Sequence, residues 1–133
     1  MALQAAVAAR AEYSREILDI KVPIIKNFFD VASRTYDQYT AGSIVRLEGD
    51  NLKFNLDAND EGVFLTDASG TENRLTVYSA TGNKQIDALL PAGLTQALTV
   101  TVRARYTDHG ELRQSKYHRP IAPVVPLIAE PSG

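Results

Sequence analysis

The chain has 133 residues, of which 44% are hydrophobic and 23% charged, and its formal net charge is −2. This length provides one domain with a hydrophobic core, and the near-neutral charge excludes the general attraction to nucleic acid and anionic membranes that basic proteins have. Cysteine is absent, which excludes disulfides, thiolate metal sites and cysteine nucleophiles and fits a cytoplasmic setting.

The first expected element is a helix over residues 2–18, because this segment is rich in alanine and contains neither proline nor glycine. Charged residues interrupt it, so it is neither a signal peptide nor a membrane span. Such a helix is suited to docking on a neighbouring domain or a second copy of the chain; the alternative is a frayed helix or the stub of an upstream domain. Its weak apolar stripe is formed by Leu3, Val7, Ala11, Ser14 and Leu18.

Short strands are expected after this segment. Val22-Pro23 begins an extended stretch because a residue before proline avoids helical angles, and the apolar run from Ile24 to Val31 predicts the first strand. A polar connection covers residues 30–40. Residues 44–48 predict the second strand, which ends at the turn formers of Gly49-Asp50-Asn51.

In the middle of the chain, short predicted strands again alternate with turns. Leu52, Phe54 and Leu56 alternate as in a strand, a polar loop covers residues 57–62, and residues 63–65 predict a short buried strand. Gly70 takes the positive-φ position of a hairpin turn. The next strands are expected over residues 72–78, with Leu75 and Val77 inward, and over residues 85–90.

The clearest strand covers residues 97–106. Its threonines and arginines alternate with apolar residues, which is the pattern of one buried and one solvated face. A hairpin loop over residues 107–111 leads to a last strand over residues 112–120. The inward set of the clear strand consists of Leu98, Val100, Val102, Ala104 and Tyr106.

These elements predict a mainly β fold, an Ig-like antiparallel β-sandwich of about seven strands with an N-terminal α-helix and a proline-rich C-terminal tail. Turn signals recur every eight to twelve residues, and no crossover helix for a parallel sheet is available after residue 20. The expected organisation is an N-terminal helix over residues 1–20, a sandwich over residues 21–121 and an extended tail over residues 122–133.

Several stretches of this sequence resemble an uncharacterised bacterial family of Ig-like domains. The resemblance is carried by residues 22–25, 41–54, 62–74 and 90–93 and by the strand over residues 97–106. In that family the Ig-like module commonly follows an HU/IHF-like DNA-binding domain, which this chain lacks; residues 2–18 are either its remnant or an unrelated helix. The resemblance implies an Ig-like fold, with no catalytic residues to carry over.

A candidate nucleic-acid or partner-binding stripe lies on the clear strand and its expected hairpin partner. The exposed residues of two paired strands share one face, so cationic side chains on both can meet phosphates. The alternative is a soluble outer sheet face whose cations pair with nearby acids. The candidate residues are Arg103, Arg105, Arg113, Lys116, His118 and Arg119.

The polar loop after residue 56 imitates the opening of a calcium-binding loop, because oxygen ligands on alternate residues can converge on a hard cation. The candidate ligands are Asp57, Asn59, Asp60 and Glu61. The twelfth position is Ala68 instead of a bidentate glutamate, so the match with an EF-hand fails. A looser calcium site between loops and a simple solvated acidic loop are the two alternatives.

Catalytic motifs are weak in this chain. A Ser115/His118 or Asp108/His109 pair lacks the arrangement of a triad, and we expect no enzyme activity and no cofactor. Phe28, Phe64 and Tyr106 are assigned to the core, with Tyr36 and Tyr39 as an exposed pair. The expected function is therefore an interaction or accessory module of a DNA-associated bacterial protein, with contacts or self-association through the helix and sheet edges. The alternatives are an extracellular adhesion or glycan-binding module and a weak hydrolase.

Overall fold

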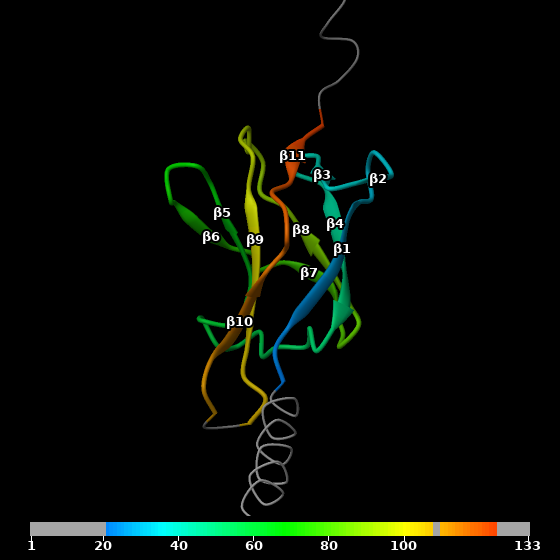
Figure 1. Ribbon diagram of the computed structural model, residues 1–133. Helices are drawn as coiled ribbons and strands as arrows, with labels where there is room; N and C mark the ends of the chain where they lie inside the picture. The colour runs from blue at the N-terminus through cyan, green and yellow to red at the C-terminus, as the bar shows by residue number, and fades with distance from the viewer. Residues whose placement is uncertain (1–20, 108–109, 125–133) are drawn as a thin grey trace, which may run out of the picture.

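The larger of two facing sheets has five antiparallel strands in the order β2-β1-β4-β8-β7 (Figure 1). In the computed structural model, which describes residues 21–107 and 110–124, the side chains of these strands alternate between the core and solvent, as period-two sequences require. The strands are β1 (Ile24–Asp30), β2 (Thr35–Tyr36), β4 (Ile44–Asp50), β7 (Tyr78–Thr81) and β8 (Gln85–Leu89).

The second sheet has four antiparallel strands in the order β10-β9-β5-β6. They are β5 (Gly62–Thr66), β6 (Glu72–Arg74), β9 (Thr99–Ala104) and β10 (Arg113–Lys116). A small parallel pair, β3 (Gln38–Tyr39) with β11 (Ala122–Pro123), closes one end of the sandwich. The first residues of the expected tail therefore form a strand, while the rest of the tail and the expected N-terminal helix lie outside the described residues.

One hydrophobic core fills the space between the two sheets. Val45, Leu47 and Ile86 of the larger sheet face Val100 and Val102 of the smaller one, and all five side chains are fully buried. Burying a side chain of this size stabilises the fold by about 1.5–3 kcal/mol relative to exposing it. The expected antiparallel sandwich is confirmed, and the described residues contain no helix. None of the described segments is a helix able to cross a membrane.

A β-bulge fixes how β1 meets the core. The register with β4 shifts between Ile25 and Asn27, so that Ile25 and Phe28, three residues apart, both point inward. Gly49 lies opposite the bulge, and a Cβ atom there would come within 1.7 Å of the Ile24 carbonyl oxygen. Only glycine fits this approach of β1 to β4.

Three expectations about the middle of the chain were wrong. No strand forms between Asp50 and Gly62: Leu52 and Phe54 are buried from an irregular segment, and Leu56 is exposed. The expected strand over residues 72–78 divides into β6 and the start of β7, and Val77, expected inward, is 55% exposed. Alternation in the sequence marks which side chains face the core, but here the backbone partners that a strand needs are missing.

The expected exposed tyrosine pair is also divided. Tyr36 is 58% exposed, whereas Tyr39 is fully buried and its hydroxyl donates to the Gln96 carbonyl oxygen at 2.5 Å. Thr101, assigned to the wet face of the clear strand, is only 2% exposed, because it lies opposite Phe64 on one side and Lys116 on the other. Long neighbouring side chains on the outer face cover this short one.

Candidate interaction surfaces

The outer face of the four-stranded sheet carries Arg103, one of the predicted cationic residues. Its guanidinium group donates to both carboxylate oxygens of Glu72 at 2.7 Å and to the Gln114 side-chain oxygen at 2.8 Å. The guanidinium carbon also lies 4.2 Å from the centre of the Phe64 ring. The hydrogen bond from Arg103 lowers the pKa of Glu72. The charge of Arg103 is therefore neutralised within its own sheet.

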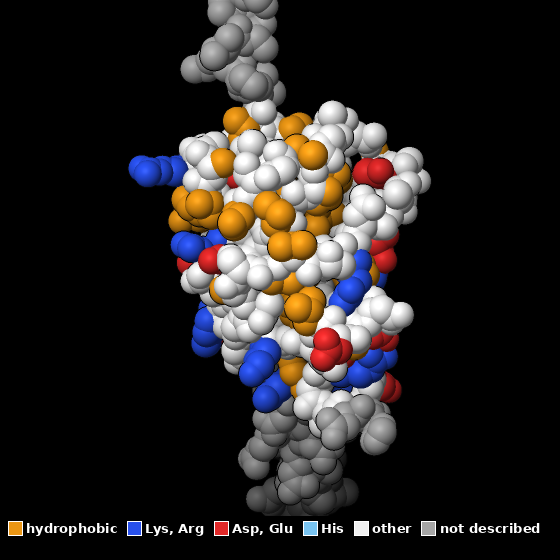
Figure 2. All heavy atoms as spheres, turned by 180° about the vertical axis from the view of Figure 1, so that it is seen from behind, with side chains coloured by type: hydrophobic (Ala, Val, Ile, Leu, Met, Phe, Trp, Pro, Cys, Tyr) orange, Lys and Arg blue, Asp and Glu red, His pale blue; other side chains and the backbone are white. Residues whose placement is uncertain are grey.

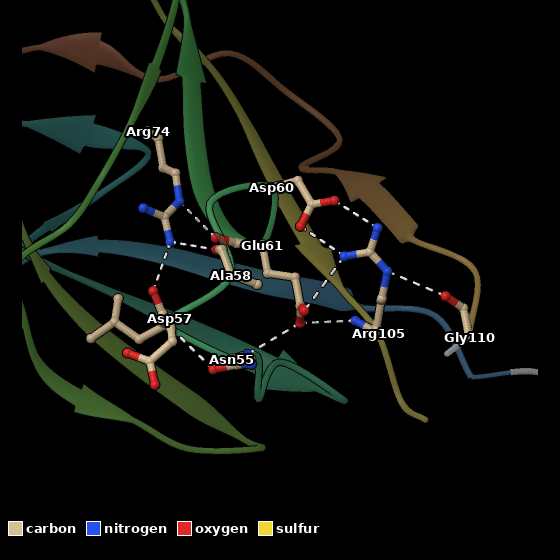
Figure 3. Close-up of polar contacts among 9 residues, drawn as sticks. Asn55, Asp57, Ala58, Asp60, Glu61, Arg74, Arg105 and Gly110 are labelled. Carbon is tan, nitrogen blue, oxygen red and sulfur yellow. Dashed lines mark hydrogen bonds and ion pairs between the residues drawn. The ribbon is translucent and has the colours of Figure 1, made fainter. Parts of the chain in front are cut away.

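Arg105, the second predicted cation of this strand, is held by the polar loop (Figure 3). Its two terminal nitrogens donate to the Asp60 carboxylate at 2.7 and 2.6 Å, and this hydrogen bonding lowers the pKa of Asp60. Glu61 is nearly buried and accepts from the backbone N–H groups of Asn55 and Arg105 at 3.1 and 3.0 Å. The carboxylates of this loop thus serve to anchor it to the end of β9.

Arg74 completes the anchoring from the other side of the loop. It donates to the carbonyl oxygens of Ala58, Glu61 and Leu56 at 2.7, 2.9 and 3.0 Å (Figure 3). Backbone carbonyls in an irregular segment need donors, and a planar guanidinium group satisfies three of them here. The sequence analysis missed this role for Arg74, because nothing in the sequence places β6 beside the loop.

The remaining predicted cations do not form one stripe. Lys116 shares the outer face with Arg103, because it lies two residues from Gln114, the partner of Arg103. Arg113 has the opposite parity, opposite Ala104, and Arg119 donates to Asp37 at 3.2 Å. The Arg119 Nε also donates to Nε2 of His118 at 3.2 Å. The structure therefore brings Arg103 and Lys116 to one face but places Arg105, Arg113 and Arg119 in separate surroundings.

The calcium-loop candidates are also used otherwise. Asp60 and Glu61 point toward Arg105 in Figure 3, and the Asp57 N–H donates to Asn55 Oδ1 at 3.0 Å. Within residues 21–107 and 110–124, no three His, Cys, Asp or Glu side chains are grouped as metal ligands. Asp57, Asp60 and Glu61 therefore form no such group.

The outer face of the five-stranded sheet has a different character. Val31 donates its N–H to the Ile44 carbonyl at 3.2 Å, Ile44 lies opposite Leu89, and the Leu89 N–H donates to the Val77 carbonyl at 2.8 Å. These four side chains, which we call the apolar row, lie side by side and are 37–55% exposed. Figure 2, the view from behind, shows apolar side chains gathered in a band across the upper half of the molecule.

The surroundings of the apolar row extend it. The Phe29 and Tyr36 rings, 5.0 Å apart, lie at the β2 edge of the same sheet, and a shallow depression beside Val77 and Leu89 is lined also by Leu75, Leu90 and Pro91. The sequence analysis missed the row because it assigned Val77 to the core. The parity of Ile44, opposite to that of buried Val45, was the available signal.

Comparison with known proteins places this architecture in a family. A model described as a domain of unknown function (DUF4469) with an Ig-like fold matches residues 24–119. The chain belongs to this family. The resemblance noted in the sequence is thereby confirmed, and the Ig-like character of the sandwich with it.

One solved structure of similar fold comes from Bacteroides vulgatus and is described as a "putative bacterial DNA binding protein". The two chains are 25% identical, and the TM-score is 0.65. The similarity covers 75% of this chain and 46% of the Bacteroides protein, so the chain spans less than half of that protein's length. No curated protein matches.

Proposed function

We propose that this chain is a non-enzymatic accessory module of a DNA-associated bacterial protein and that it joins two copies of that protein through the apolar row. The observation that carries the proposal is the row itself: Val31, Ile44, Leu89 and Val77 remain partly exposed on a sheet whose other face contributes Val45, Leu47 and Ile86 to the buried core. An exposed, contiguous apolar patch marks a contact surface more often than a scattered exposed side chain does.

The charges around the apolar row favour a second copy of the chain as the partner. The charged pair next to the row on the same strands, Arg46 and Asp87, is joined at 2.9 Å. Lys26 and Lys84, at the opposite end of this sheet, both bind Asp50. Glu48 accepts from Asn27 at 3.5 Å. A rim of balanced charge does not attract a strongly charged partner, but it allows the same face of another copy to approach in a two-fold dimer.

The association with DNA rests on the description of the Bacteroides protein and belongs to the proposal. The pairing of Arg103 with Glu72 and of Arg105 with Asp60 supports a role in protein contacts over direct DNA binding by this face. A cytoplasmic location is part of the same proposal. The glycan-binding alternative loses its main support, since Tyr39 is buried and leaves Tyr36 without its expected partner.

Sedimentation equilibrium of the 133-residue chain from about 1 to 200 μM tests the proposed self-association. We expect a monomer–dimer equilibrium whose dissociation constant rises at least about tenfold in an Ile44→Ser/Leu89→Ser variant, because two apolar side chains lose their burial in the dimer. Leu56→Ser is the matched control, since Leu56 is 44% exposed outside the row. A monomer at every concentration, or equal weakening by Leu56→Ser, contradicts the proposal.

A further inference from the structure

A hollow of about 500 Å³ lies at the end of the sandwich opposite the apolar row, where β1 begins, β4 ends and β8 begins. Its volume falls in the range of small-molecule sites. A smaller hollow beside it shares Asn55, Arg105 and Tyr106. The larger one is lined by Lys21, Lys53, Phe54, Asn55, Asn83, Arg105 and Tyr106.

Two lysines carry positive charge that no carboxylate of the described residues pairs. Neither Lys21 nor Lys53 has a salt bridge within residues 21–107 and 110–124, whereas Lys26 and Lys84 both bind Asp50. The Lys21 ammonium group lies 6.0 Å from the centre of the Tyr106 ring, a separation at which the ring face still attracts a cation. This contact directs Lys21 to the rim of the hollow.

Two carboxylates of the described residues near the hollow, those of Asp60 and Glu61, already have partners. Asp60 is bound by both terminal nitrogens of Arg105, and Glu61 accepts two backbone N–H groups and lies 3.7 Å from Arg105. Three cations and two carboxylates therefore meet here, and the excess positive charge belongs to the two lysines. An anion entering the hollow meets these lysines without displacing an existing salt bridge of the described residues.

The remaining lining supplies hydrogen-bond donors and an apolar wall. Asn55 uses its side-chain oxygen to accept from the Asp57 N–H, and no acceptor among the described residues takes up the side-chain amide hydrogens of Asn55 or Asn83. The Tyr106 hydroxyl donates to the Asn51 carbonyl oxygen at 2.7 Å, and burial above all raises its pKa to about 12. The neutral ring thus presents an uncharged surface beside the cations.

We propose that this hollow binds a phosphoryl group, with Lys21 and Lys53 as the charged contacts and the amides of Asn55 and Asn83 as neutral donors. A dianionic phosphate matches two ammonium groups in charge, and lysine binds phosphate as a point charge without requiring a fixed geometry. The phosphoryl group belongs either to a nucleic-acid backbone or to a small phosphorylated molecule. This inference does not depend on self-association, because the apolar row lies at the other end of the strands.

Titration of the ¹⁵N-labelled full chain with inorganic phosphate, against sodium chloride of equal ionic strength, tests the site by NMR. We expect amide shifts concentrated at the lining residues and an apparent affinity that falls at least tenfold in Lys21→Gln/Lys53→Gln. Lys116→Gln is the matched control, because Lys116 is exposed on the outer face of β10 and should leave the affinity unchanged. All three lysines are exposed, and retained amide dispersion verifies that the variants fold.

A second titration with a 12-nucleotide single-stranded DNA distinguishes the two sources. Binding at least tenfold tighter than phosphate, strongly weakened by salt and lost in the double variant, identifies a nucleic-acid backbone. Affinity no greater than that of phosphate identifies a small phosphorylated ligand. Absence of any phosphate-specific shift, or shifts that persist in Lys21→Gln/Lys53→Gln, overturns the proposal. Self-association is measured separately, so its failure leaves this result unaffected.

Discussion

The outer faces of the two sheets differ in how far their apolar side chains are covered. On the four-stranded sheet the aromatic ring of Phe64 is covered by Arg103, so that Phe64 is only 5% exposed, and the charge of Arg103 is paired with Glu72. On the five-stranded sheet, by contrast, Ile44 and Leu89 lie opposite each other, and each remains more than a third exposed. The first face completes its interactions within the chain, and the second leaves apolar area for a contact.

Among the polar contacts, the largest expected effect on stability lies at the anchored loop beside the four-stranded sheet. Glu61→Ala leaves the backbone N–H groups of Asn55 and Arg105 without their acceptor, which should lower the free energy of unfolding by about 3 kcal/mol. Urea unfolding followed by circular dichroism measures it. Glu111→Ala is the control, because that side chain is 84% exposed. Equal stability of the two variants would show that the loop is not a structural anchor.

A smaller loss of stability is expected where Arg103 covers Phe64. Arg103→Ala removes the cation from the ring and the paired hydrogen bonds to Glu72, at a cost of about 1–2 kcal/mol in the free energy of unfolding. Arg103→Lys should recover part of this, since lysine keeps the charge but not the planar fork. Urea unfolding followed by circular dichroism measures both variants. An unchanged midpoint for Arg103→Ala would show that the cover of Phe64 does not stabilise the four-stranded sheet.

Substitution in the apolar row should hardly change the stability of the monomer. Ile44→Ser is expected to change the free energy of unfolding of the monomer by less than about 1 kcal/mol, because the side chain is already partly exposed. Leu47→Ala, inward on the same strand and fully buried, should cost about 2–5 kcal/mol. Unfolding below the dimer dissociation constant isolates the monomer. A comparable loss for both variants would mean that Ile44 serves folding and not contact.

The smallest expected effect is on the pH dependence of the thermal midpoint. Hydrogen bonds from Lys26 and Lys84 lower the pKa of Asp50 from 3.8 to about 2, so the charged carboxylate favours the folded chain above pH 4, and this contribution disappears as the pH falls from about 4 to 2. The thermal midpoint of Asp50→Asn should therefore fall less steeply over this interval than that of the unaltered chain. Parallel slopes in circular dichroism melts at pH 5, 3 and 2 would show that these exposed pairs do not contribute.

The sequence by itself determined the β class, most strand positions and several turns. Period-two alternation identified Val100, Val102 and Ala104 as inward, and local backbone preference placed Gly70 at positive φ, where its φ is 88°. These features depend on neighbours within a few residues. The same signals also predicted a strand over residues 52–56 that does not form and one continuous strand over residues 72–78 that is divided, because burial and strand pairing give similar patterns.

Only the tertiary structure decided which charges meet and which apolar side chains stay exposed. Arg105 binds Asp60, 45 residues away, and Arg103 binds Glu72 across the sheet, so two of the cations that looked free in the sequence are neutralised. Ile44 and Leu89 become neighbours through strand order alone. Alternation assigns a side chain to a face, but charge balance and patch formation depend on the partner strand, and that choice is made by packing of the whole core.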